Sequence, residues 1–128
     1  MLNVPGSVRI FLAKEPVDMR KGFDGLASLV RLQGEDVYSG HLFAFASKRL
    51  DRIKILTWDN GGFVLFYKRL EKGRFRMPRW AGTETSVQLD GAQLSMLLDG
   101  IDMNMVRRPP KWKPSSLSRK GIDIIELV

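Results

Sequence analysis

The chain has 128 residues, 44% of them hydrophobic, which is enough for one domain with a buried core. Its 21 basic and 14 acidic side chains give a formal net charge of +7, and this balance favours an anionic partner, nucleic acid before an acidic membrane surface. With no cysteine and a single histidine, the sequence excludes disulfides, thiolate catalysis and zinc sites built on cysteine or histidine clusters, so neither a metal nor a cofactor is expected.

The N-terminal segment predicts neither export nor membrane insertion. It lacks a charged start followed by an apolar core, and no apolar run in the chain approaches the roughly 20 residues that a membrane span needs. A cytoplasmic protein with no membrane contact is therefore expected.

A strand and a helix are the first predicted elements. The strand occupies residues 7–13, after the turn at Pro5-Gly6. Asp18 is well placed as the N-cap of a helix that ends within residues 31–34. The apolar positions of this helix form one stripe, made by Met19, Phe23, Leu26, Ala27 and Val30.

The predicted first turn of this helix breaks two local rules. Arg20 and Lys21 place cations where the helix dipole prefers anions, and Gly22 and Gly25 each cost about 1 kcal/mol relative to alanine. One interpretation is a phosphate site formed by free backbone N–H groups and the two cations. The other is that the glycines let the helix lie close to a sheet while the bases are solvated.

The centre of the chain predicts an antiparallel meander of three strands. Asp59-Asn60-Gly61-Gly62 is a hairpin signal, because Asn and Gly adopt positive φ at low cost, and residues 47–52 form a looser basic turn. A short edge strand is considered for residues 75–79. Neither face of the strands is wholly polar, so partial cover on both faces is expected. The three predicted strands are residues 42–46, 53–58 and 63–69.

Positive charge is concentrated in this central part of the sequence. Residues 48–79 carry ten basic and three acidic side chains. A solvated surface usually mixes both signs, so a surface of one sign attracts a polyanion, and interleaved aromatic residues are typical of nucleic-acid readers. The alternative is a soluble surface that is basic without any such partner.

No catalytic constellation is found in the sequence. The acidic residues are mostly explained as caps and turns, whereas a two-metal nuclease needs clustered carboxylates. His41 is interpreted as a structural hydrogen-bonding residue and Trp58 as part of the core. No P-loop, nucleophile elbow or Ser-His-Asp set is present. A binding or accessory protein is therefore favoured over an enzyme.

The second half of the chain predicts a strand, an acidic helix and a basic arm. Residues 85–89 form the strand, Asp90 and Gln93 form a capping pair, and Gly100 ends the helix. Residues 80–106 contain four acids and no base, whereas residues 107–128 contain six bases and two acids. The predicted fold class is α+β: one domain of residues 1–106, an antiparallel meander packed with two helices, followed by an extended basic arm of residues 107–128.

Several sequence blocks resemble the TnpB-type accessory protein from the sixty-six family of bacterial insertion sequences. The resemblance covers about residues 3–108, and the tail from Lys111 departs from it. It implies a protein encoded beside a larger, separate transposase and needed for, or helpful to, transposition. It implies no catalytic residues. The blocks are Asp18-Met-Arg-Lys-Gly-Phe-Asp-Gly-Leu26, Gly40-His-Leu-Phe-Ala-Phe45, Arg52-Ile-Lys-Ile-Leu-Thr-Trp-Asp59, Gly62-Phe-Val-Leu-Phe-Tyr-Lys-Arg-Leu-Glu-Lys-Gly-Arg-Phe75 and Leu94-Ser-Met-Leu-Leu-Asp-Gly-Ile-Asp102.

Together, charge and resemblance predict a non-catalytic accessory protein for transposition that contacts DNA through a basic sheet edge and a helix N-terminus. The rival prediction is an adaptor that docks on the transposase through the acidic helix and the apolar C-terminus, without touching DNA. A metal nuclease is a third class, for which no cleavage is expected. The candidate DNA-binding residues are Arg20, Lys21, Lys48, Arg49, Arg52, Lys68, Arg69, Lys72, Arg74, Arg76, Arg107, Arg108, Lys111 and Trp112.

Overall fold

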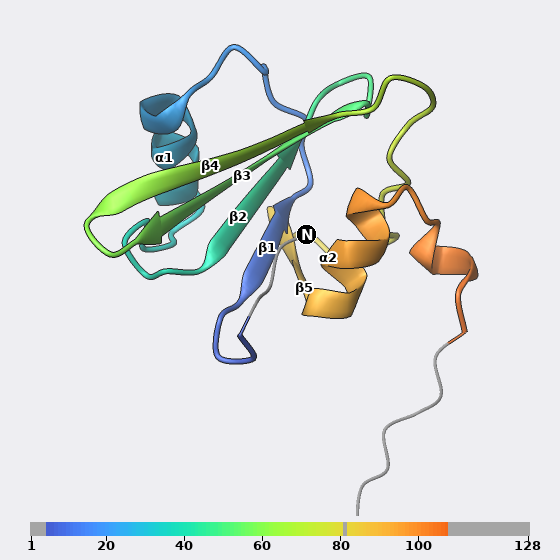
Figure 1. The fold of residues 1–128 in the computed structure, drawn as a ribbon. Helices are drawn as coiled ribbons and strands as arrows, with labels where there is room; N and C mark the ends of the chain where they lie inside the picture. The colour runs from blue at the N-terminus through green and yellow to red at the C-terminus, as the bar shows by residue number, and fades with distance from the viewer. Residues whose placement is uncertain (1–4, 81, 108–128) are drawn as a thin grey trace, which may run out of the picture.

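A computed structural model describes residues 5–80 and 82–107, which form an α+β fold with one five-stranded sheet (Figure 1). The candidate residues Arg108, Lys111 and Trp112, and most of the predicted arm, lie outside the described residues. The elements in chain order are β1 (Ile10–Ala13), α1 (Phe23–Leu32), β2 (Leu42–Ala46), β3 (Arg52–Asp59), β4 (Gly62–Arg69), β5 (Ser86–Leu89), α2 (Gly91–Leu98) and a short 3-10 helix, η1 (Met103–Met105).

The sheet contains the predicted meander and extends beyond it. Its strand order is β4-β3-β2-β1-β5, in which β2, β3 and β4 pair antiparallel as expected. The first strand pairs parallel with β2 and antiparallel with β5, so the sheet is mixed rather than purely antiparallel. The parallel pair requires a crossover, which α1 provides.

The β3–β4 hairpin closes as its sequence predicts. Asn60 has a φ of +45° and Gly61 a φ of +92°, which are the two successive left-handed residues of a type I′ turn. This turn pairs Asp59 with Gly62 and sets the register of the whole hairpin, through to Arg52 opposite Arg69. Residues of the two strands that face each other therefore alternate between the two faces of the sheet.

One helix covers each face of the sheet, so the molecule has three layers (Figure 1). On one face, Leu26, Ala27 and Val30 of α1 pack against strand residues that include Phe43 and Leu56. Leu94, Leu97 and Leu98 of α2 lie on the other face, packed against Leu12, Ala44, Ile53, Ile55 and the loop residue Phe75. Each strand of the interior thus supplies apolar side chains to both faces, which explains why neither face of the sequence pattern is polar.

Two predictions of secondary structure are wrong, and the first strand is also shorter than predicted, Ile10–Ala13 rather than residues 7–13. The first helix begins at Phe23, with Gly22 in an extended conformation at the N-cap position, so Met19, Arg20 and Lys21 lie in the preceding loop. The helix therefore has no cation in its first turn, and Gly22 costs it no propensity. Residues 75–79 form no strand, because Phe75 turns into the core instead of pairing along β4.

The second helix agrees with its sequence. Asp90 accepts a hydrogen bond from the Gln93 backbone N–H at 2.8 Å, and the Gln93 side chain accepts one from the Asp90 N–H at 2.9 Å. This reciprocal capping box satisfies two helix donors that would otherwise lack partners. Gly100 follows the helix with a φ of +75°, as expected of a residue that ends a helix. In the described part of the chain, no helix is long and apolar enough to cross a membrane.

Candidate functional site

Three loops meet at one end of the sheet. They are the β2–β3 turn, the loop that follows β4, and the loop between β1 and α1. The Leu70 N–H donates to the Asp51 carbonyl at 2.7 Å and the Phe75 N–H donates to the Leu50 carbonyl at 2.6 Å, which tie the loop after β4 to the turn. The Val17 N–H donates to the Ala46 carbonyl at 2.9 Å and ties the third loop to the end of β2.

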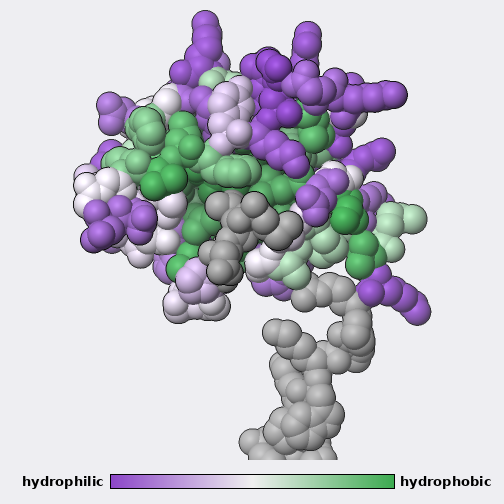
Figure 2. All heavy atoms as spheres, viewed as in Figure 1, coloured by the Kyte–Doolittle hydropathy of each residue, from purple (hydrophilic) through white to green (hydrophobic). Residues whose placement is uncertain are grey.

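Most of the predicted DNA-binding residues come together at this end of the sheet, here called the basic end. Nine of the predicted cations lie there, together with four acids, Glu15, Asp18, Asp51 and Glu71. Hydrophilic side chains project from the top of the view in Figure 2, above the end of β2 and the β2–β3 turn in Figure 1. The nine cations are Arg20, Lys21, Lys48, Arg49, Arg52, Arg69, Lys72, Arg74 and Arg76.

The β2–β3 turn is held by its first residue, Ser47, which is buried. The Ser47 hydroxyl donates to the Asp51 carboxylate at 3.1 Å and accepts from the Arg52 N–H at 3.1 Å. Leu50 adopts a φ of +59°, which lets the chain reverse so that its N–H reaches the Ser47 carbonyl at 2.9 Å. The turn therefore presents Lys48 and Arg49 as exposed side chains on a fixed backbone.

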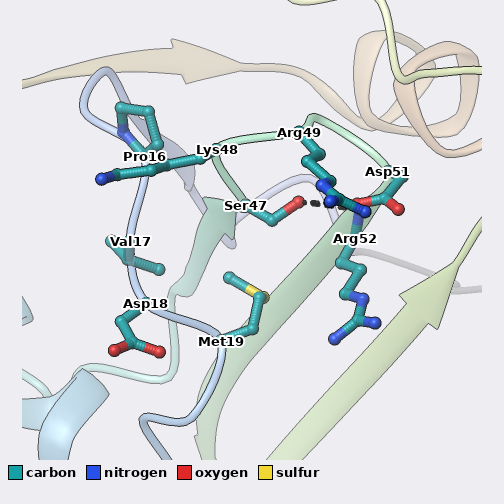
Figure 3. A pocket seen from close by; sticks show the side chains of 9 residues that line it. All are labelled: Pro16, Val17, Asp18, Met19, Ser47, Lys48, Arg49, Asp51 and Arg52. Atoms are coloured by element: carbon teal, nitrogen blue, oxygen red, sulfur yellow. Dashed lines mark hydrogen bonds between the residues drawn. The ribbon is translucent and has the colours of Figure 1, made fainter.

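A pocket of about 420 Å³ separates this turn from the loop before α1 (Figure 3). Its lining includes three cations, two carboxylates and three apolar side chains. Within residues 5–80 and 82–107, neither Lys48 nor Arg49 forms an ion pair. The Lys48 ammonium and the Arg49 guanidinium are therefore available to an anion. The lining residues are Pro16, Val17, Asp18, Met19, Ser47, Lys48, Arg49, Asp51 and Arg52.

Asp18, which lines the pocket, forms an ion pair with Arg20. The Arg20 guanidinium donates to both carboxylate oxygens of Asp18, with the shortest contact at 2.6 Å, and the Arg20 N–H donates at 2.9 Å. These hydrogen bonds favour the ionised carboxylate and lower the pKa of Asp18 from 3.8 to about 2. The Asp18 side chain caps its own turn rather than the helix, whose N-cap position holds Gly22.

Replacing Arg20 by glutamine should return the pKa of Asp18 toward 3.8, because the charged donor is lost. The pair favours the folded state above pH 3.8, and its contribution is lost as the pH falls toward 2, since the folded-state pKa is lowered. Carboxyl carbon chemical shifts measured by NMR against pH report the pKa directly. Arg69→Gln is the control and should leave the pKa of Asp18 in place. An unchanged pKa in Arg20→Gln would contradict the pairing.

Two further basic residues of this end lie opposite each other on the sheet. Arg52 and Arg69 are direct neighbours across β3 and β4 on the face that α1 covers. Like charges in this position repel each other, and the two guanidinium groups bind different partners. The Arg69 guanidinium donates to Glu71 at 2.9 Å, while that of Arg52 donates to the Tyr67 hydroxyl at 3.4 Å.

Lys68 and Lys54 use their charges inside the molecule. The Lys68 ammonium donates to the Leu98 carbonyl at 2.6 Å, on the face that α2 covers. This carbonyl is one of those at the C-terminal end of α2 that have no partner within the helix. The Lys54 ammonium, on the opposite face, donates to the carbonyls of Met19 and Lys21 at 2.7 and 2.8 Å. Sequence reasoning missed Lys54 as a site residue. Its position on β3, in the same inward-facing series as Leu56, was the available signal.

The other candidates are placed separately. Arg107 is exposed at the end of the described chain, beyond η1. The His41 ring nitrogen Nδ1 accepts from the Arg9 N–H at 3.0 Å, which confirms the predicted structural role. Trp58 is half-buried and contacts Tyr38 and Phe63, and it belongs to neither buried cluster. Among the described residues, no group of three or more His, Asp or Glu side chains is arranged to hold a metal ion.

Comparisons with known proteins give a consistent assignment. A family model described as IS66 Orf2 like protein matches residues 8–108. Uncharacterized protein y4jC of Sinorhizobium fredii (strain NBRC 101917 / NGR234) is 34% identical over 119 residues, which cover 92% of this chain and 100% of that protein. Uncharacterized protein y4hO of the same strain is 36% identical over 119 residues, covering 91% of this chain and 99% of that protein. No solved structure matches at a significant level.

Proposed function

The chain belongs to the family of IS66 Orf2 like proteins, as its sequence blocks predicted, and on that premise we propose that it is a non-catalytic accessory protein of transposition that binds DNA through its basic end. Membership in a family tied to an insertion sequence supports the transposition role. The concentration of nine cations against four acids at one end of the sheet is the observation that carries the DNA contact.

The charge arrangement suits a phosphate backbone. A surface of one sign attracts a polyanion over distances of several ångströms, and each phosphate that a lysine or arginine neutralises releases a bound counterion. Most of these cations lie on loops that hydrogen bonds tie to one another and to the end of β2, so little ordering is needed on binding. Contacts of this kind position a protein on DNA without reading its sequence.

The predicted DNA-binding cations differ in their internal partners. Arg20 and Arg69 each form an ion pair with a carboxylate two residues away in the chain. They contact a phosphate either with the N–H donors that remain free or by giving up the carboxylate for the phosphate. Arg52 contacts a neutral hydroxyl. Lys68 lies outside the proposed interface, because its ammonium binds the end of α2. Within the described residues, seven cations of the basic end form no ion pair, and these are Lys21, Lys48, Arg49, Arg52, Lys72, Arg74 and Arg76.

A second candidate function is an adaptor that binds the separate transposase of the same element. The described residues from 82 to 106, which include α2 and η1, contain Glu84, Asp90, Asp99 and Asp102 and no basic side chain. This acidic side complements a basic partner protein and is unsuited to DNA. The two surfaces adjoin, because Asp102 lines a pocket together with Arg74 and Arg76 of the basic end.

A gel-shift experiment with element ends and with random DNA, each at two salt concentrations, tests the proposal. Binding that weakens steeply with salt is expected for both DNAs, since phosphate contacts dominate the affinity. Binding that does not change with salt would overturn the phosphate contact. A transposase pull-down that survives nuclease treatment, together with no DNA shift, would select the adaptor instead.

A further inference from the structure

We infer that Lys54 is a positioning residue for the DNA contact. By holding the loop before α1 against the sheet, it fixes Arg20 and Lys21, which directly follow the pocket residues Asp18 and Met19 in the chain. The inference rests on the proposed function for its link to DNA, whereas the holding of the loop is a property of the fold alone. Lys54 itself is buried under the loop and does not reach a ligand.

The environment of Lys54 is unusual for a lysine. Its exposed fraction is 6%, and in the described part of the chain no carboxylate lies within ion-pair distance of its ammonium. The ammonium donates to the Met19 carbonyl at 2.7 Å and to the Lys21 carbonyl at 2.8 Å. It also lies 4.7 Å from the centre of the Tyr67 ring, on the neighbouring strand. Two carbonyl dipoles and one aromatic face therefore replace the water and the counter-charge.

An apolar side chain at this position would fill the same space but would leave the loop unpaired. Burying an ammonium costs free energy unless hydrogen bonds compensate it, and the carbonyls of Met19 and Lys21 supply that compensation. Hydrogen bonds to a charged group are also stronger than those between neutral groups. The chain thus joins a strand of the sheet to a loop through the buried end of a long side chain.

The loop gains its shape from this attachment. The carbonyls on either side of Arg20 turn inward to Lys54, while the side chains of Arg20 and Lys21 remain exposed. The Lys21 N–H donates to the Asp18 carbonyl at 3.1 Å, and the Arg20 N–H donates to the Asp18 carboxylate at 2.9 Å. Residues 19–21 are therefore held by Lys54 of the sheet and, at their N-terminal side, by Asp18.

The same loop supplies one wall of the pocket. Asp18 and Met19 line it opposite Lys48 and Arg52 (Figure 3). A loop that moved would carry its two cations away from those of the β2–β3 turn. Holding them together allows one stretch of phosphate backbone to meet both groups without ordering the loop on binding.

Lys54→Met tests the inference, with Lys68→Met as the matched control. Both changes remove one positive charge and one sheet lysine that donates to main-chain carbonyls, but only the first releases the loop. Trypsin cleavage after Arg20 and Lys21, followed by mass spectrometry, should accelerate about tenfold or more in Lys54→Met. DNA affinity at low salt should fall about fivefold or more. Lys68→Met should change neither quantity, and Lys54→Arg should restore both in part.

Each outcome decides a separate part of the inference. Equal cleavage of Lys54→Met and the unaltered protein would overturn the attachment. Faster cleavage with unchanged DNA affinity would overturn the positioning role. If the unaltered protein does not bind DNA, the proposed function fails, while the cleavage rates still decide the attachment. If Lys54→Met does not fold, hydrogen exchange at the Lys21 amide of the unaltered protein decides instead, because an attached loop is protected and a free one exchanges rapidly.

Discussion

Reversing the charges of Lys48 and Arg49 should weaken DNA binding on the order of a hundredfold near 0.1 M salt, because two phosphate contacts are lost and two repulsive ones are added. Both side chains are exposed, and neither forms an ion pair within the described residues. The backbone of their turn is fixed by Ser47, so Lys48→Glu with Arg49→Glu should leave the fold intact. The salt dependence of binding should also fall by about two units of slope.

The matched control reverses two exposed arginines at other places, Arg9 before β1 and Arg31 in the last turn of α1. Each reversal removes two units of charge, so both double variants go from +7 to +3. Fluorescence anisotropy with a short duplex over a salt series measures affinity and slope together. Equal losses in the two variants would show that DNA senses only the total charge, and the basic end would then have no special role.

Replacing Phe75 by alanine should destabilise the protein by about 3–5 kcal/mol, since the ring is a large group at the centre of a packed cluster. Phe75 is 1% exposed and packs beneath the loop after β4, among residues of the sheet and α2. This cost is a large share of the stability of a typical domain. Urea unfolding should show a lower midpoint with an unchanged slope.

Phe23→Ala is the control for this change, because Phe23 is 46% exposed at the start of α1 and its loss should cost about 1 kcal/mol or less. Equal costs would contradict the buried position of Phe75. DNA binding provides a second measurement. Phe75 lies between Arg74 and Arg76, and its ring belongs to the cluster against which Leu50 of the β2–β3 turn packs, so Phe75→Ala should also reduce affinity under conditions where the variant remains folded.

Local signals in the sequence predicted much of this fold. The meander, the Asn60-Gly61 turn and the Asp90 capping box each depend on a few adjacent residues, and all three are confirmed. The resemblance to a transposition accessory family is also confirmed. In the candidate site, the clustering of the turn and loop cations follows from the meander itself, since the β2–β3 turn and the end of β4 necessarily meet at one end of the sheet.

Features that depend on distant residues were not predictable. The pairing of β1 with β2 and β5 is set by segments far apart in the sequence, and a period-2 pattern does not reveal the neighbour of a strand. The predicted start of α1 is wrong because Asp18 has the chemistry of an N-cap, but its carboxylate accepts hydrogen bonds from the backbone and the guanidinium of Arg20 instead of from helix N–H groups. Lys54 and Lys68 were read as surface charge, because their carbonyl partners lie about thirty residues away along the chain.

The position of β1 has a consequence for biosynthesis. The ribosome makes Ile10 before the other four strands, but its neighbour Leu89 only after all of those that precede β5 have been completed. The nascent meander can pair early, because its contacts are local. The apolar face that includes Leu12, Ala44 and Ile55 then stays uncovered until α2 leaves the exit tunnel. A translation product that stops short of α2 would therefore expose this face to other chains and to chaperones.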